Sequence, residues 1–135
     1  MKFVSSLMLA TLLVACSKPS SDEEKVRAVF AAAETAAEDR DASDVLALVA
    51  TDYADRQGFD KTQLGHFLRG YFFTHPKLEL AVSVDDVQFP ADGLARARVT
   101  VTSLDLTDPQ REHLDVELRR DGGDWRVARA DRADR

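Results

Sequence analysis

Tyr53 and Asp55, separated by one residue, are the pair whose types and spacing could perform acid–base chemistry. They lie just after a predicted helix, in a polar stretch. An aspartate whose pKa is raised by an apolar wall, with a tyrosine hydroxyl as a donor beside it, could move a proton at a carbon acid. The simpler interpretation, which we favour, is that both are solvated loop residues that help to cap neighbouring helices.

The remaining candidates for catalysis are Tyr71, His75 and Asp105. Tyr71 falls on an apolar helical stripe, where a core tyrosine whose hydroxyl reaches the rim is more common than a catalytic one. His75 ends the same predicted helix, and its cationic form suits a helix C-terminus, so we predict a capping role. His113 alternates with the apolar residues of a predicted strand and belongs to a solvated sheet face.

No metal, phosphate or nucleophile motif accompanies these residues. The acids around Gly58 do not have the spacing of an EF-hand calcium loop, and the three histidines lack the paired spacing of zinc ligands. The chain has no nucleophile elbow and no glycine-rich phosphate loop. We therefore expect neither a metal nor a cofactor.

The first 15 residues have the layout of a secretory signal, with Lys2 at the start, an apolar run over 3–14 and small residues before Cys16. The run is too short for a membrane-spanning helix, which needs about 20 residues. Its end, Leu13-Val14-Ala15-Cys16, resembles the lipobox of bacterial lipoproteins. That resemblance implies cleavage before Cys16 and acylation of this cysteine, which would anchor the chain to a membrane. The alternative is a secreted protein whose signal happens to end near the chain's single cysteine.

A serine after the cysteine, here Ser17, resembles lipoproteins that are sent to the outer membrane. We therefore expect the protein to be anchored at the periplasmic face of the outer membrane. Residues 16–21 would be the acylated cysteine and a short tether. Removing residues 1–15 leaves 17 basic and 24 acidic residues, a net charge of −7. This balance argues against a nucleic-acid partner, which needs a basic stripe, and against electrostatic binding to anionic lipid. The membrane contact should be the lipid itself.

Two helices are predicted before residue 52. The first begins at Asp22, because Ser21 and Glu24 have the spacing of a capping box, and it ends near Asp39-Arg40. Its inner face is narrow, with Phe30 among small residues. The second helix is short, and Asp41 is its N-cap.

A third helix, over residues 61–74, carries the strongest pattern in the chain. Asp60 and Gln63 have capping-box spacing, and the residue before Pro76 must leave the helix. Its apolar side chains recur with helical period and predict one stripe that packs on the strands that follow. The stripe consists of Leu64, Phe67, Leu68, Tyr71 and Phe72.

The rest of the chain alternates with the period of strands. A slip of phase after Val84 predicts a β-bulge near Asp85-Asp86, and a second slip after Val101 predicts a bulge on the next strand. Turns are expected at 90–93 and 121–124, with a loop at 107–111. We expect the Arg/Asp-rich end, residues 131–135, to be frayed.

These elements predict one α+β domain over residues 22–131, with three N-terminal helices packed on a curved antiparallel sheet of about four long strands. Bulges on neighbouring strands would curl the sheet into a cone around the helices and leave an apolar interior. The side chains expected to line this interior are Phe30, Phe67, Tyr71, Phe72 and Trp125.

The element order, Phe30, the Arg40-Asp41 join and the ending Gly123-Asp124-Trp125-Arg126-Val127 resemble the nuclear transport factor two-like superfamily. Its α+β cone is found in ketosteroid isomerase, scytalone dehydratase, polyketide cyclases and limonene epoxide hydrolase, and in non-enzymatic binding and dimerising domains. The stretch from Tyr53 to His75 resembles small proteobacterial lipoproteins with this domain. The isomerase-like pattern has an inward tyrosine on the first helix, where this chain has Phe30.

We therefore expect an envelope lipoprotein whose domain binds a small apolar ligand or a protein partner without catalysis. Two alternatives remain open. One is an isomerase, dehydratase or hydrolase that uses Asp55 with Tyr53 or Tyr71, and the other is a subunit of an envelope assembly. The outer sheet face, partly apolar at Leu104 and Leu106, could support a homodimer, as in many members of the superfamily.

Overall fold

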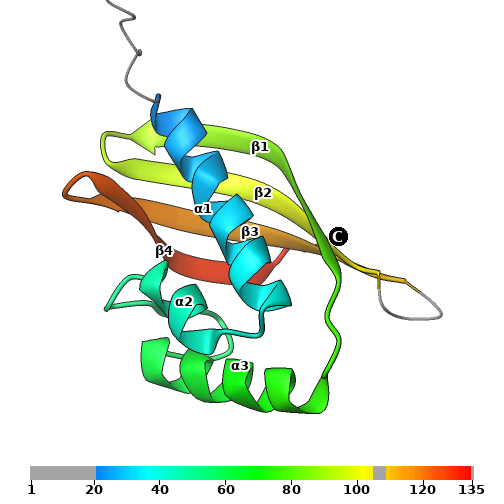
Figure 1. Ribbon diagram of the computed structural model, residues 1–135. Coiled ribbons are helices and arrows are strands. Elements are labelled where there is room, and N and C mark those ends of the chain that lie inside the picture. Colours follow the sequence, from blue (N-terminus) through cyan, green and yellow to red (C-terminus); the bar gives the residue numbers. More distant parts are fainter. Residues whose placement is uncertain (1–20, 105–108, 135) are drawn as a thin grey trace, which may run out of the picture.

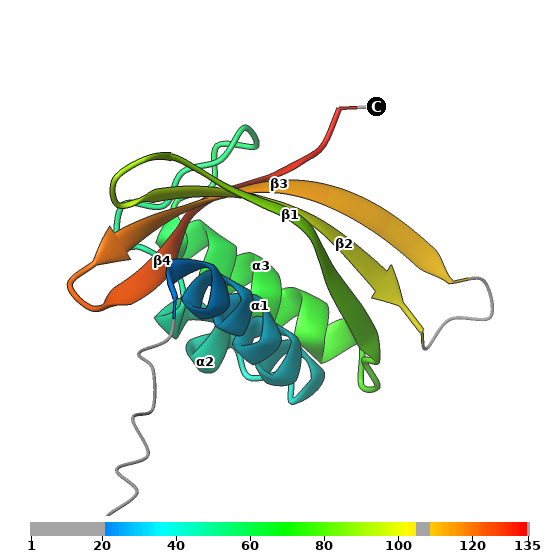
Figure 2. The ribbon, with the colours of Figure 1, turned by 90° about the horizontal axis from the view of Figure 1, so that it is seen from above.

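The computed structural model describes residues 21–104 and 109–134. The predicted signal peptide, Cys16, most of the tether, Asp105 and Leu106 lie outside these residues. The helices are α1 (Asp22–Glu38), α2 (Ala42–Ala47) and α3 (Lys61–Thr74), and the strands are β1 (Leu80–Ala91), β2 (Leu94–Ser103), β3 (Gln110–Asp121) and β4 (Asp124–Arg132). The strands form one antiparallel sheet in the order β1-β2-β3-β4, and the helices lie on one side of it (Figure 1 and Figure 2). The predicted α+β architecture is confirmed.

The predicted caps fix where the helices begin. Ser21 Oγ accepts from the Glu24 amide at the start of α1, and Asp60 and Gln63 form both bonds of a capping box at the start of α3. α1 ends in a Schellman-type turn, with the Arg40 and Asp41 amides bonded to carbonyls of its last turn. None of the helices in the described residues is both long enough and apolar enough to cross a membrane.

The predicted bulge in β1 is confirmed. Val84 pairs with Val99 and Asp86 with Arg98, so Asp85 is the extra residue. A second irregularity separates Gln88 from Ala91 on the same strand. These interruptions bend β1 over the helices, as Figure 1 shows.

The bulge predicted on β2 is wrong, since β2 pairs with β3 without a break from Leu94 to Ser103. The alternation stops there because the strand ends. The other bulge lies on β4, where Glu117 pairs with Arg129 and Leu118 with Val127. The prediction that residues 131–135 are frayed is also wrong for Asp131 and Arg132, because β4 continues to Arg132.

The main core lies between α1 and the sheet. Val26 and Phe30 on α1 pack into a cluster with buried residues of three strands: Ala95, Ala97, Val99, Val116, Leu118 and Trp125. A smaller core joins Ala42, Phe72 and Leu78. α3 packs mainly on α2. The prediction that its stripe packs on the strands is confirmed only in part, because Leu68, Tyr71 and Phe72 pack with Leu78 and Leu80 around the start of β1.

Candidate functional site

Tyr53 and Asp55 are in contact, as their spacing allows. The Tyr53 hydroxyl donates to Asp55 Oδ2 over 2.8 Å, and the Ala130 carbonyl oxygen of β4 lies 3.4 Å from it. Tyr53 is 3% exposed, so it is buried and not the solvated residue we expected. Burial, followed by the bond to Asp55, raises the pKa of Tyr53 well above its ordinary value of 10. The hydroxyl therefore stays protonated at neutral pH.

The Asp55 carboxylate is committed to its own loop. Its Oδ1 accepts from the amides of Gln57 and Phe59 at 2.9 and 3.1 Å, while Oδ2 accepts from Tyr53. Gly58 has a φ of 83°, which closes the turn with a conformation that few other residues adopt. These bonds set the loop just before the Asp60 cap of α3. The hydrogen bonds of Tyr53 and Asp55 therefore stabilise this loop, and none of the hydrogen bonds described for Asp55 is directed toward an open cavity.

A row of aromatic side chains runs along α3. Phe67 lies 5.8 Å from Phe59 and 6.1 Å from Tyr71, measured between ring centroids, and His75 stacks on Tyr71 at 3.9 Å. His75 is the C-cap of α3, and its Nδ1 lies 2.8 Å from the Tyr71 carbonyl oxygen, as a capping residue should. Phe67 is 52% exposed, so the stripe is not buried whole.

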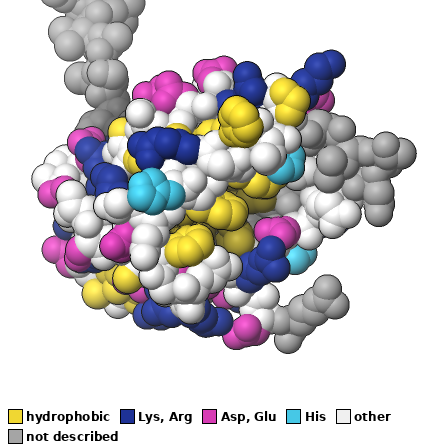
Figure 3. Space-filling view, turned by 90° about the horizontal axis from the view of Figure 1, so that it is seen from below, with side chains coloured by type: hydrophobic (Ala, Val, Ile, Leu, Met, Phe, Trp, Pro, Cys, Tyr) yellow, Lys and Arg dark blue, Asp and Glu magenta, His cyan; other side chains and the backbone are white. Residues whose placement is uncertain are grey.

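An apolar hollow lies on the same side of the molecule as α3. Figure 3 views the molecule from below Figure 1, where α3 lies, and shows hydrophobic side chains gathered around a hollow. Val101 and Leu114 lie on the core face of the sheet yet are only half-buried, so that part of the face is incompletely covered. The aromatic row and this sheet surface therefore leave apolar area open to a ligand.

The five aromatic residues expected to line one interior are separated. Phe30 and Trp125 belong to the main core, and Phe72 belongs to the smaller one. Phe67 and Tyr71 lie in the aromatic row. The reason is that α3 packs on α2, which keeps its aromatic side chains away from the core under α1.

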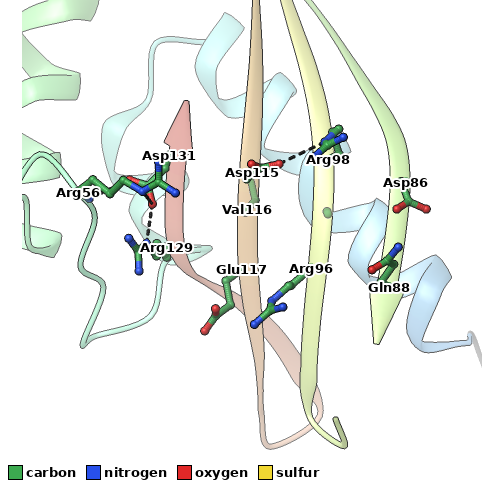
Figure 4. A pocket seen from close by; sticks show the side chains of 11 residues that line it. Arg56, Asp86, Gln88, Arg96, Arg98, Asp115, Val116, Glu117, Arg129 and Asp131 are labelled. Atoms are coloured by element: carbon green, nitrogen blue, oxygen red, sulfur yellow. Dashed lines mark hydrogen bonds and ion pairs between the residues drawn. The ribbon is translucent and has the colours of Figure 1, made fainter. Parts of the chain in front are cut away.

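The opposite face of the sheet carries a charged groove of about 480 Å³ (Figure 4). Arg98 pairs with Asp115 over 3.3 Å. Asp131, 8% exposed, accepts from the Arg56 amide at 2.8 Å and from Arg129 Nε at 2.5 Å. Burial acts to raise the pKa of Asp131, but the Arg56 amide and the Arg129 guanidinium outweigh it and hold the pKa below its ordinary value of 3.8.

The sequence analysis missed this groove, although charged residues on β2 and β3 alternate with buried alanine, valine and leucine. That alternation puts the charges on the face away from the helices. No local sequence pattern predicts the hydrogen bond between the Arg56 amide and Asp131, since 75 positions separate the two residues. Among residues 21–104 and 109–134, no three His, Cys, Asp or Glu side chains are grouped so that they could hold a metal ion.

Solved structures resemble this fold closely. A domain of unknown function with a cystatin-like fold from Nostoc punctiforme PCC 73102 superposes with a TM-score of 0.71 at 17% identity, covering 87% of this chain and 80% of that one. An NTF-2-like protein of unknown function from Shewanella oneidensis MR-1 superposes with a TM-score of 0.68 at 11% identity, covering 84% of this chain and 100% of that one. This chain has an NTF2-like α+β fold.

A putative scytalone dehydratase from Novosphingobium aromaticivorans DSM 12444 has a TM-score of 0.69 at 12% identity, with 82% and 81% of the two chains covered. No family model matches the chain, and no curated protein matches it. Identities this low establish the NTF2-like fold alone, and the same fold serves unrelated functions.

Proposed function

We propose that this chain is a lipoprotein of the cell envelope whose NTF2-like domain binds a small apolar ligand without catalysing a reaction. The ligand would lie in the apolar hollow beside α3. The lipid on Cys16 would hold the domain at the periplasmic face of the outer membrane. The lipobox-like stretch before Cys16 supports the anchor, and the aromatic row supports the ligand.

The aromatic row is the observation that carries the proposal. Phe59, Phe67, Tyr71 and His75 contact one another in sequence along one side of α3. Phe67 is more than half exposed. Leaving this apolar surface in water is unfavourable, and an apolar ligand that covers the ring would remove that unfavourable exposure. Ligand sites are commonly concave and mostly apolar, as this hollow is.

The state of the acid–base pair favours binding over catalysis. A general base needs an oxygen that can reach a substrate proton, but both oxygens of Asp55 accept bonds from their own loop. Tyr53, its partner, is buried against β4, and its hydroxyl donates a hydrogen bond to Asp55. Neither side chain is presented to the hollow by these contacts.

A neutral fluorescent probe, N-phenyl-1-naphthylamine, tests the ligand site. Phe67→Ala removes the most exposed ring of the row and should weaken probe binding roughly fivefold or more. Phe73→Ala is the matched control, because Phe73 lies on the same helix, is exposed and forms no ring contact with the row within the described residues. Equal probe affinity for the wild type and Phe67→Ala would reject the site.

Membrane fractionation tests the anchor separately. Cys16→Ser should release the protein from the membrane pellet, because no other part of the proposal holds it there. Ser17→Asp keeps the cysteine but places an acid after it, and the lipoprotein resemblance implies that this variant stays in the inner membrane. A Cys16→Ser protein that still sediments with membranes would reject the lipid anchor.

A further inference from the structure

We propose a second binding site, in the pocket between the α1–α2 join and α3, for a small organic monocarboxylate with an aromatic or apolar body. The pocket has a volume of about 330 Å³ and is lined by Asp39, Arg40, Ala42, Arg69, Phe72 and Phe73. In Figure 1 the α1–α2 join lies above α3, whose C-terminal half supplies the last three of these residues. Arg69 and Phe73 are four residues apart and form a separate row from Phe67, Tyr71 and His75, so this site is distinct from the hollow.

The two arginines of the pocket form no ion pair with an acid in the part of the chain that the structure describes. Eight of the twelve arginines in the described residues form ion pairs, in a chain with more acids than bases. Arg40 and Arg69 are two of the four that form none, and both line this pocket. Two arginines that form no ion pair in the described residues and line one pocket could supply bidentate hydrogen bonds to a carboxylate.

An apolar wall stands beside these charges. Phe73 is 88% exposed, the most exposed of the large hydrophobic residues in the part of the chain that the structure describes. Phe72 and Ala42 are buried in the smaller core and form the floor. A ligand ring placed against Phe73 would bury apolar area that is now in water. The pocket is thus complementary to a ligand that has an apolar body attached to an anionic group.

The backbone at Arg40 gives independent support. Its φ is 54°, in the left-handed region, and it is the residue just past the C-cap of α1, where glycine is the preferred residue. The turn itself needs only a residue that tolerates this conformation. An arginine here adds strain, and its guanidinium forms no ion pair within the described residues. Strained residues of this kind are found disproportionately at ligand sites.

Asp39 limits the number of negative charges that a ligand of this pocket can carry. It lines the same pocket at the C-terminal end of α1, where the helix dipole is also negative. The lining therefore carries two positive groups and one negative group, and a second anionic group on the ligand would be repelled. This arrangement selects a monocarboxylate over a dicarboxylate or a phosphate. The volume suits a small molecule of this kind.

Calorimetric titration of the full chain with N-acetyl-L-phenylalanine tests the site, and the amide of the same compound, which lacks the carboxylate, is the ligand control. We expect the acid to bind and the amide to bind at least about tenfold more weakly. Arg69→Gln should weaken acid binding roughly tenfold. Arg96→Gln, a change to an unpaired arginine outside the pocket, should leave it unchanged.

Arg40→Gly separates binding from folding. Glycine suits the left-handed turn, so the variant should melt at the same temperature as the wild type or higher, yet bind the acid about tenfold more weakly. Equal binding of acid and amide, or unchanged acid binding in both Arg40→Gly and Arg69→Gln, would overturn the proposal. Phe67→Ala should leave acid binding intact, so the two proposed sites can fail independently.

Discussion

The indole nitrogen of Trp125 donates a hydrogen bond to Asp22 Oδ1 over 3.2 Å, which joins β4 to the first residue of α1. Arg120 reinforces the contact, since it pairs with Asp22 at 3.4 Å and lies over the Trp125 ring at 5.6 Å from its centroid. The same carboxylate lies in the first turn of α1, where the helix dipole favours it. This cluster fixes the start of α1 on the sheet, next to the tether.

Asp22→Ala should therefore lower the free energy of unfolding by about 1 kcal/mol, because the indole N–H of the buried Trp125 loses its partner. Urea denaturation measures the change. Glu24→Ala is the control, since Glu24 lies in the same helical turn but its side chain makes no described contact with the sheet. Equal losses in the two variants would show that the dipole, and not the Trp125 contact, accounts for the effect.

Tyr53→Phe should lower the free energy of unfolding by about 1 kcal/mol at neutral pH, because Asp55 then loses one of its three donors. The folded pKa of Tyr53 is raised above the unfolded value of about 10, so its contribution to stability is complete below pH 10 and falls as the pH rises further. Wild type should thus lose stability above pH 10 more steeply than Tyr53→Phe. Parallel alkaline curves would contradict the raised pKa. Probe binding should be unaffected.

Helix boundaries and one bulge could be predicted because their signals are local. Asp60, Gln63 and Pro76 lie within or next to α3, and the structure places that helix at the predicted residues. The phase slip at Asp85 is likewise visible within a few positions. On β2, the same signal was misread, because alternation also stops where a strand ends.

The packing partners could not be predicted, since they depend on contacts between distant residues. The α3 stripe is equally apolar whether it meets α2 or the sheet, and only the assembled fold decides between them. The candidate pair Tyr53 and Asp55 was found from its spacing, but its burial comes from β4, 77 positions from Tyr53. The contact between Arg56 and Asp131 depends on the same kind of long-range approach, since 75 positions separate the two residues.

Asp131→Asn should destabilise the fold by about 2 kcal/mol at neutral pH, because Arg56 and Arg129 lose a shared, buried carboxylate. The folded pKa of Asp131 lies below its unfolded value near 3.8, so the wild-type advantage is present above that pH and disappears as the pH falls through the folded pKa. Thermal unfolding between pH 2 and pH 7 measures both effects, and the two proteins should converge in acid.

Asp134→Asn is the matched control for Asp131. Its carboxylate also pairs with Arg56, at 3.3 Å, but its side chain is almost fully exposed, so the change should be close to neutral. A loss for Asp134→Asn as large as that for Asp131→Asn would mean that Arg56, and not the buried position of Asp131, accounts for the stability.

Gly70 offers a change that should stabilise the protein. It lies inside α3 with helical backbone, and a Cβ built there meets nothing within 4 Å. Gly70→Ala should raise the free energy of unfolding by about 0.5–1 kcal/mol, because alanine loses less backbone entropy in a helix. Urea denaturation of Gly122→Ala provides the contrast: a Cβ there is also unobstructed, but the φ of 64° should make that variant less stable by about 1 kcal/mol. If both variants shifted in the same direction, free space rather than backbone conformation would be setting the outcome at these two glycines.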